Sequence, residues 1–272
     1  MKILSYNVNG IRAAMKKGLI DFIQSENPDI LGFQELKANK EDIDEKAFQD
    51  LGYHTYWLSA EKKGYSGVGI ISKTKPKEVI EGMGHEFFDK EGRTLIAVYD
   101  NFTLVNTYFP SGTSGEERQN LKYEFLDYYF SFIEEMKKKY PNLIVLGDYN
   151  IAHTDIDIHS PKTNQKSSGF LPEERAWMTK WFDNGMLDSF RHLYPEKLGA
   201  YTWWTARFPS VRLENKGWRI DYVSITESLK ENLKDVPSID LKPYEKEVVR
   251  FKFWDWIFVR LLKYSWLKIY RS

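Results

Sequence analysis

Acids and amides stand at the ends of several short apolar runs in this chain. Asn7 and Asn9 follow the first run, and Glu35 follows the second. Asp148 and Asn150 follow a later run. Because residues two apart on a strand point to the same side, each of the two pairs can present its polar groups together. Oxygen donors of this kind, in a chain with five histidines and no cysteine, suit a hard cation such as Mg²⁺ or Mn²⁺.

A hard cation held by carboxylates usually handles phosphate oxygens, and it neutralises charge in the transition state of phosphodiester hydrolysis. In that chemistry Glu35 would be the metal ligand, and Asp148 would orient or deprotonate the attacking water. Asn7 and Asn150 would donate hydrogen bonds to the phosphate or hold the acid in place. Tyr108 also ends an apolar run. Its phenol would serve the leaving side of the reaction, or would make a structural hydrogen bond in the core.

Strand-end acids and amides have a simpler use in turns and helix caps, and that interpretation is favoured for any one cluster taken alone. The chain has four such clusters in distant segments, the last of them around Asp221. One edge of a rigid sheet can bring all four together, as α/β enzymes commonly do. The set as a whole therefore favours a shared site.

The elements that must position these residues are predicted from periodicity. Seven apolar runs predict buried strands, at residues 2–6, 29–34, 67–71, 94–99, 103–108, 143–146 and 220–225. Residues 19–23 carry a short helical stripe, and residues 116–139 a long one with basic residues at its C-terminal end. Another helix is expected to begin at Pro172. Strands and helices that alternate without a nucleotide-binding glycine loop predict an α/β fold of packed sheets with helices outside.

Length and composition limit the class of protein. The 272 residues include 39 basic and 39 acidic side chains, and 42% are hydrophobic, which suits one large α/β domain or two small ones. The absence of cysteine excludes a disulfide scaffold, a thiolate zinc site and a cysteine nucleophile. No uncharged apolar stretch reaches the roughly 18 residues of a membrane span, and the N-terminus has no signal-peptide pattern. We therefore expect a cytoplasmic monomer without integral membrane contact.

Seven stretches, in this order, resemble the exonuclease III family of apurinic/apyrimidinic endonucleases, which lies within the DNase I-like superfamily of metal-dependent phosphodiesterases. They read SYNVNGIR, QELK, NTYFP, GDYNIAH, GFLPEER, YTWW and GWRIDY, and they span residues 5–222. The resemblance implies a four-layer α/β sandwich of two packed mixed sheets flanked by helices. It also implies Mg²⁺- or Mn²⁺-dependent cleavage 5′ to abasic sites in double-stranded DNA, and 3′-to-5′ trimming of DNA.

The resemblance also implies a role for each clustered polar residue. Glu35 is the metal ligand, with Asn9 beside it. Three residues surround the attacking water and the phosphate: Asn7, Asp148 and Asn150. Tyr108 faces the phosphate or the leaving group, and Asp221 is the acid that normally pairs with a catalytic histidine. Three residues match positions that line the pocket for a flipped-out abasic sugar: Trp203, Trp218 and Ile220.

Basic residues interleaved with aromatics favour contact with DNA, although a solvated charged loop is the simpler interpretation outside the motif context. Four such residues lie in 207–219, among the tryptophans: Arg207, Arg212, Lys216 and Arg219. Further candidates for contacts to DNA phosphates are Arg12, Lys37, Asn164 and Lys166. An enzyme that acts on a damaged nucleotide commonly extrudes it into an apolar pocket, and a missing base lowers the cost of doing so.

The sequence departs from the family after residue 235. The family normally ends with a strand that carries Ser-Asp-His, and no such motif follows here, because all five histidines lie upstream. Loss of one such group typically costs on the order of 10²–10⁴ in rate, so we expect impaired catalysis beside an intact metal site and DNA surface. A missing terminal strand would also expose an edge of the second sheet. We expect an endonuclease/exonuclease/phosphatase-like domain over residues 1–235.

The tail, residues 236–272, differs sharply in composition from the rest. It has eight basic and four acidic residues, nine of the chain's aromatics and no glycine. Translation out of frame after a frameshift near residue 235 explains the break best. The alternative is a basic amphipathic helix over residues 251–270 that lies on a membrane surface or a partner.

Two other functions share most of these features. A catalytically silent module would bind abasic DNA without cleaving it, and the missing histidine separates it from an active nuclease. A phospholipid or inositol-phosphate hydrolase of the same superfamily would use the tail to reach membranes. The YTWW and GWRIDY stretches favour DNA over lipid.

Overall fold

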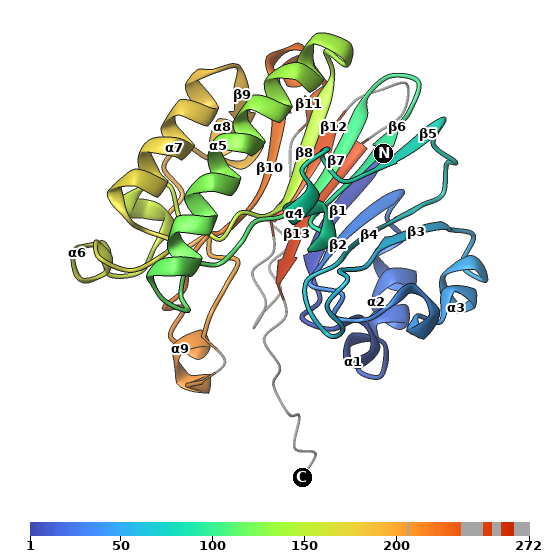
Figure 1. Ribbon diagram of the computed structural model, residues 1–272, viewed down its shortest axis with the longest axis horizontal. Coiled ribbons are helices and arrows are strands. Elements are labelled where there is room, and N and C mark those ends of the chain that lie inside the picture. Colours follow the sequence, from blue (N-terminus) through green and yellow to red (C-terminus); the bar gives the residue numbers. More distant parts are fainter. Residues whose placement is uncertain (206, 235–246, 252–256, 264–272) are drawn as a thin grey trace.

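The structure is a computed structural model that describes residues 1–205, 207–234, 247–251 and 257–263 (Figure 1). The strands are β1 (Lys2–Asn7), β2 (Ile30–Gln34), β3 (His54–Leu58), β4 (Val68–Ser72), β5 (Glu78–Glu81), β6 (Thr94–Val98), β7 (Thr103–Tyr108), β8 (Leu143–Asp148), β9 (Met186–Asp188), β10 (Asp221–Thr226), β11 (Leu233–Lys234), β12 (Glu247–Phe251) and β13 (Ile257–Lys263). The helices are α1 (Ile11–Met15), α2 (Leu19–Glu26), α3 (Glu45–Gln49), α4 (Glu86–Lys90), α5 (Glu116–Lys139), α6 (Pro161–Asn164), α7 (Pro172–Asp183), α8 (Ser189–Leu193) and α9 (Pro209–Leu213). Short 3-10 helices cover Lys40–Asp42, Asp155–Asp157 and Glu227–Asn232.

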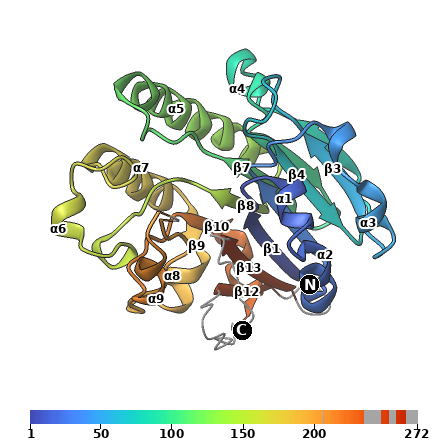
Figure 2. The same ribbon diagram turned by 90° about the horizontal axis from the view of Figure 1, so that it is seen from below.

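These strands form two mixed sheets that face each other, with helices on both outer sides (Figures 1 and 2). One sheet has the order β11-β12-β13-β1-β2-β4-β3, and the other has the order β5-β6-β7-β8-β10-β9. Helices α1 to α3 cover the first sheet, and α5 and α7 cover the second (Figure 2). The four-layer α/β sandwich is therefore confirmed, and so are all seven predicted strands and the long helix at 116–139.

Three apolar layers hold the four layers of structure together. Ile3, Ile30 and Ile70 of the first sheet meet Leu104 and Ile144 of the second in the central layer. A second cluster fills the space between the first sheet and helices α1 to α3. The third lies between the second sheet and the helices α5 and α7. Burial of apolar area on this scale is the main stabilising contribution to the fold.

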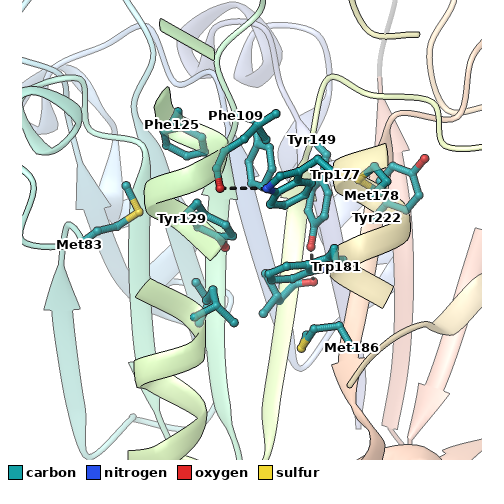
Figure 3. Close-up of a cluster of buried hydrophobic side chains, with 14 of the residues drawn as sticks. Met83, Phe109, Phe125, Tyr129, Tyr149, Trp177, Met178, Trp181, Met186 and Tyr222 are labelled. Atoms are coloured by element: carbon teal, nitrogen blue, oxygen red, sulfur yellow. Dashed lines mark hydrogen bonds between the residues drawn. The ribbon is translucent and has the colours of Figure 1, made fainter. Parts of the chain in front are cut away.

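The third layer is rich in aromatic rings, and Figure 3 shows them between α5, α7 and the strands. Phe109 and Tyr149 are stacked with ring centroids 4.4 Å apart, and Phe109 also meets Trp177 edge to face at 5.7 Å. The indole N–H of Trp177 donates to the carbonyl of Leu126 at 3.0 Å. Because Phe109 and Tyr149 directly follow Tyr108 and Asp148, this packing anchors the ends of β7 and β8.

The tail contributes two strands to the first sheet. β13 pairs in parallel with β1, from Lys2 opposite Phe258 to Asn7 opposite Lys263, and it pairs antiparallel with β12. The expectation that the terminal strand is missing is therefore wrong for the first sheet, where β13 lies beside β1. The amphipathic-helix interpretation is also wrong for 257–263, which form a strand. The composition break at 235–237 lies outside the described residues.

No helix within the described ranges is long and apolar enough to cross a membrane.

Candidate active site

The ends of five strands meet at one edge of the sandwich. In the first sheet, β1 and β2 run in parallel and place Asn7 opposite Gln34, just before Glu35. In the second sheet, β7 and β8 run in parallel and place Tyr108 opposite Asp148. β10 runs antiparallel to β8, so its first residue, Asp221, also lies opposite Asp148. Remote segments of the sequence are thus brought together, as the strand-end pattern predicts.

Asn7 joins the two sheets at this edge. Its side-chain nitrogen Nδ2 donates to Oε1 of Glu35 at 2.9 Å and to Oδ2 of Asp148 at 2.8 Å. Its Oδ1 accepts from the backbone N–H of Asn9 at 3.0 Å, which fixes the orientation of the amide. Asn7 and Asp148 have no exposed surface. One buried amide therefore holds two carboxylates from different sheets in a fixed relation.

Asp148 is further held by its own turn. Its Oδ1 accepts from the backbone N–H of Asn150 at 3.0 Å, while the side-chain Nδ2 of Asn150 donates to the carbonyl of Phe109 at 2.9 Å. Close approach of the strands depends on Gly147, where a Cβ atom would lie 1.8 Å from the carbonyl oxygen of Thr107. The residue before Asp148 must therefore be glycine for β7 and β8 to lie as they do.

Tyr108 donates its phenol O–H to Oε1 of Glu35 at 2.9 Å. Burial raises the pKa of Tyr108 well above its ordinary value, and the nearby carboxylates of Glu35 and Asp148 raise it further. The phenol is therefore protonated at neutral pH and acts as a hydrogen-bond donor. The guanidinium carbon of Arg93 lies 5.1 Å from the centroid of the Tyr108 ring, and Nη1 of Arg93 donates to the Tyr108 carbonyl at 2.9 Å.

Lys37 bridges the residues expected to hold the metal. Its Nζ lies 2.7 Å from Oε2 of Glu35 and 2.6 Å from Oδ1 of Asn9. The backbones of Asn9, Glu35 and Lys37 all have positive φ angles, of 46°, 56° and 49°. Residues other than glycine adopt this conformation at a cost and keep it only where their surroundings impose it, commonly at functional sites. The fold therefore holds these three side chains in place through a strained backbone.

Buried amides fix the distance between the sheets directly beneath this site. The side chain of Asn106 on β7 donates to the carbonyls of Phe33 at 2.9 Å and Gly69 at 2.8 Å in the opposite sheet. Its Oδ1 accepts from the side chain of Gln34 at 2.7 Å. Asn106 and Gln34 have no exposed surface. Because Gln34 precedes Glu35 and Asn106 lies two residues before Tyr108, this contact sets their separation.

A cavity of about 840 Å³ opens beside the strand ends. Asn7, Asn9, Glu35, Tyr108 and Asn150 form its polar floor. Its apolar wall includes three residues that the resemblance assigns to a sugar pocket: Trp203, Trp218 and Ile220. The lining of the cavity therefore combines polar groups, Glu35 among them, with aromatic surface.

The aromatic wall is braced from behind. Trp203 and Trp218 exchange backbone hydrogen bonds at 2.8 Å in both directions, and their rings meet edge to face with centroids 6.1 Å apart. The hydroxyl oxygen of Thr202 accepts from the backbone N–H groups of Ile220 at 3.0 Å and Asp221 at 3.1 Å. Thr202 therefore positions both the wall and the first residue of β10.

Arg219 corrects one expectation about DNA contacts. Its side chain has no exposed surface and pairs with Asp157 and Asp188, each at 2.7 Å. Burial raises the pKa of Asp157, but Arg219 and Arg191 outweigh burial and hold that pKa well below its usual range. Arg219 therefore ties its loop to the domain and does not reach solvent to contact DNA.

A second buried ion pair supports the opposite wall. Lys122 on α5 contacts Glu174 on α7, and neither side chain has any exposed surface. Lys122 also donates to the carbonyl of Asn150 at 2.9 Å. The other carboxylate oxygen of Glu174 accepts from the backbone N–H groups of Gly169 at 2.6 Å and Leu171 at 3.0 Å. This pair connects two helices to the loop that lines the cavity.

The remaining candidates for DNA contacts fall into three places. Arg12 and Lys37 line a groove beside α1. Lys166 is exposed and lines the main cavity, whereas the side chain of Asn164 is turned to the carbonyls of His159 and Ser160. Three candidates lie in or beside α9: Arg207 is exposed, the guanidinium carbon of Arg212 lies 5.0 Å from the Trp204 ring centroid, and Lys216 pairs with Glu214.

The donor set fits a hard cation. Among the described residues, no three histidine, aspartate or glutamate side chains form a ready-made metal cage. The site instead offers one carboxylate, Glu35, beside the amide oxygen of Asn9, and both oxygens already contact the positive charge of Lys37. Mg²⁺ and Mn²⁺ accept such mixed oxygen ligands and retain several waters.

The sequence did not single out several residues of the cavity. These are Ser111, Gly112, Thr113, Gln119, Ser167 and Ser168. The segment 111–113 directly follows the strand that ends at Tyr108, so its position after a strand end was an available signal. Residues 167–168 carry no comparable signal, because long-range contacts with Glu174 place their loop.

A two-sheet α/β sandwich with carboxylates and amides gathered at one edge is the arrangement of the DNase I-like proteins. The endonuclease/exonuclease/phosphatase family model matches residues 4–260, and the chain belongs to this family. An exodeoxyribonuclease of Bacillus subtilis (strain 168) is 41% identical over 236 residues, which cover 86% of this chain and 92% of the relative.

Solved structures agree with this assignment. The AP endonuclease from Archaeoglobus fulgidus matches with a TM-score of 0.81 at 27% identity, over 92% of this chain and 99% of that chain. A 3′ phosphatase from Neisseria, bound to a product DNA hairpin, matches with a TM-score of 0.82 at 27% identity and the same coverage. The resemblance to exonuclease III-type enzymes in the sequence is thereby confirmed.

Proposed function

We propose that this chain is a DNA-repair phosphodiesterase that uses Mg²⁺ or Mn²⁺ to cleave double-stranded DNA 5′ to abasic sites. We propose further that it trims DNA from 3′ ends. The relatives support this proposal, because they are exodeoxyribonucleases and AP endonucleases that match over most of the chain. One observation carries it furthest: Asn7, which lines a cavity shared with Glu35 and three tryptophans, donates to the carboxylates of both Glu35 and the buried Asp148.

Each residue at the floor has a distinct chemical task. Glu35 and Asn9 hold the cation, which when bound neutralises charge on the phosphate oxygens. Asp148 orients or deprotonates the attacking water, and Asn7 keeps the carboxylate in position. Tyr108 donates its hydrogen bond toward the leaving side, because its raised pKa keeps the phenol protonated. Asn150 and Asp221 complete the set around Asp148.

The facing wall suits the damaged nucleotide. Trp203, Trp218 and Ile220 give the cavity apolar surface that accepts a sugar without its base. Basic residues at the rim contact phosphates on either side: Arg12, Lys37, Lys166, Arg207 and Arg212. We also propose Asn164 as a phosphate contact, although its amide group donates to the backbone carbonyls of His159 and Ser160.

Incision by this chain is slower than is typical of its relatives. None of the five histidines in the sequence lines the main cavity in the described part of the chain, although the family resemblance implies a histidine there as an acid/base group. His153 instead contacts the hydroxyl of Thr179 at 2.9 Å, and His85 caps the N-terminus of α4. Loss of one such group lowers the rate by about 10²–10⁴.

An incision assay on Asp148→Asn tests this assignment. A labelled duplex with one abasic residue is incubated with Mg²⁺, and the rate of nicking is compared with that of the unchanged chain. Loss of the base or water-orienting group should lower the rate by at least about 10² while the affinity for the duplex is retained. The surface variant Asp127→Asn on α5 is the matched control and should nick at the unchanged rate. Equal rates for Asp148→Asn and the control would refute the role of Asp148.

We propose that residues 1–235 are the catalytic domain and that residues 236–272 arose from a change of reading frame. The lack of glycine and the excess of aromatic and basic residues in the tail support this. Translation of the coding DNA in the two other frames beyond residue 235 tests it. A Ser-Asp-His motif in a neighbouring frame is the expected result, and its absence from both frames would contradict the proposal.

The structure of the tail does not favour a lipid or inositol-phosphate substrate. Its main support was an amphipathic tail helix, and residues 257–263 form a sheet strand. A silent DNA-binding module would share the cavity but would give binding without nicking in the same assay.

A further inference from the structure

We propose that the ammonium group of Lys37 is an internal cation that holds the metal position between Glu35 and Asn9 and leaves it when the divalent ion binds. The inference rests on the proposed metal site and adds a competitor to it. Lys37 would then set the affinity for the metal, in addition to any contact it makes with DNA phosphates.

The geometry around Lys37 is that of a bound cation. Nζ lies 2.7 Å from Oε2 of Glu35 and 2.6 Å from Oδ1 of Asn9, within the range of short charge-assisted hydrogen bonds. These are the two oxygens that the metal needs. A lysine ammonium is a compact, strongly hydrated point charge, so it can occupy a site built for a hydrated hard cation. Two cations at the same two oxygens repel each other, so the ammonium weakens the binding of a divalent ion there.

The backbone brings Lys37 to this position. The N–H of Leu36 donates to the carbonyl of Gly67 at 3.1 Å, and the N–H of Lys37 donates to the carbonyl of Ser66 at 2.9 Å. These bonds hold Glu35 and Lys37 at φ angles of 56° and 49°, and the ammonium of Lys37 reaches both Glu35 and Asn9. Because the neighbouring loop imposes this conformation, the bridge is a built feature of the fold.

The side chain of Lys37 has room to move away from the metal position. Its side chain is 38% exposed, and its stem is flexible. It lines the groove of about 800 Å³ beside α1, which also contains the carboxylates of Asp42 and Asp44. When a divalent ion takes the oxygens of Glu35 and Asn9, the ammonium can therefore move toward Asp42 and Asp44 in this groove, which Arg12 and Lys16 also line, without leaving the surface of the protein.

The bridge from Lys37 to Glu35 and Asn9 stabilises the site before a metal binds. Asn7 donates to the carboxylates of both Glu35 and Asp148, so the two negative charges are neighbours and repel each other. The ammonium of Lys37 compensates part of this negative charge. The proposed cost is a weaker affinity for the metal, because binding must first break two charge-assisted contacts.

Binding of Mn²⁺ alone to the full-length protein, followed by electron paramagnetic resonance, tests the inference without any turnover. Lys37→Met removes the competing charge and keeps most of the stem, and it should bind Mn²⁺ about tenfold more tightly, the equivalent of one charge-assisted contact. Lys37→Gln should show the same direction. Lys37→Arg keeps the charge and should bind within about threefold of the unchanged chain. Lys138→Met, at the far end of α5, removes one charge remotely and should leave the affinity unchanged.

Glu35→Gln separates the two levels of the proposal. If this variant binds Mn²⁺ as tightly as the unchanged chain, the metal site itself is elsewhere and the proposed function loses its ligand. If Glu35→Gln loses Mn²⁺ while both neutral Lys37 variants bind with equal or weaker affinity, the metal site stands and the competition is refuted. Far-ultraviolet circular dichroism of each variant confirms that it is folded before titration.

Discussion

The buried ion pair between α5 and α7 allows a quantitative prediction. Lys122→Met keeps the aliphatic stem of the side chain but removes its ammonium group. Glu174 then remains as a carboxylate with no exposed surface and without its cationic partner. The contact from Lys122 to the carbonyl of Asn150 is lost as well. The variant therefore perturbs both the packing of the two helices and the turn that carries Asn150.

The size of the effect follows from burial. Since neither side chain has exposed surface, solvent does not screen the pair, and removal of one partner costs about 3–5 kcal/mol of unfolding free energy. The carboxylate of Glu174 retains the backbone N–H groups of Gly169 and Leu171, so the loss falls at the lower end of that range. Removal of the second charge with Glu174→Gln should cost little more. The coupling energy of the two substitutions is therefore expected to be at least about 2 kcal/mol.

Urea-induced unfolding, followed by tryptophan fluorescence, measures the difference. The midpoint for Lys122→Met should fall by about 1–2 M relative to the unchanged chain. Lys138→Met breaks an exposed pair with Glu135 and should change stability by less than about 0.5 kcal/mol. A loss below about 1 kcal/mol for Lys122→Met, or additive effects in the double variant, would show that the pair does not hold the helices together.

Two further predictions concern the site and its brace. Tyr108→Phe removes the hydrogen bond to Glu35. It should lower kcat on an abasic duplex by about 10²-fold with little change in KM. An unchanged kcat would show that the phenol takes no part in the reaction. The pKa of Asp157 is depressed in the folded protein because Arg219 and Arg191 outweigh burial, so its contribution to stability is complete above about pH 4 and is lost as the pH falls further. Thermal unfolding of Asp157→Asn should show a lower melting temperature at neutral pH and a flatter decline between about pH 4 and pH 2, whereas an unchanged slope would contradict the assignment.

Much of the fold could be predicted because short apolar runs in the sequence indicate buried strands. The run at 143–146 is continuous in apolar residues, as expected for a strand covered on both faces. The strand at His54–Leu58 escaped prediction because it is an edge strand whose residues are mostly half-buried or exposed. Residues 257–263 mix basic and apolar side chains, and their pairing with β1 depends on a partner more than 240 residues away.

The sequence predicted which residues form the site, but it did not predict which of them contact one another. Strand-end positions identified Asn7, Glu35 and Asp148, and the structure joins them through one amide. The bridge from Lys37 to Asn9 could not be read from spacing, because it depends on positive φ angles that the loop at Ser66 imposes. Arg219 was misassigned for a related reason: its charge suggested DNA, but its partners come from distant segments.

The most direct test of the central claim is single-turnover incision of a 5′-labelled duplex that carries one abasic residue, with the full-length chain in excess. With Mg²⁺ present, we expect slow nicking immediately 5′ to the abasic residue, leaving a 3′-hydroxyl that a DNA polymerase extends. We expect no such product from the matched intact duplex or after chelation of the metal. A product that forms equally well without divalent metal, or no nick at all under enzyme excess, would contradict a metal-dependent phosphodiesterase site at this edge of the sandwich.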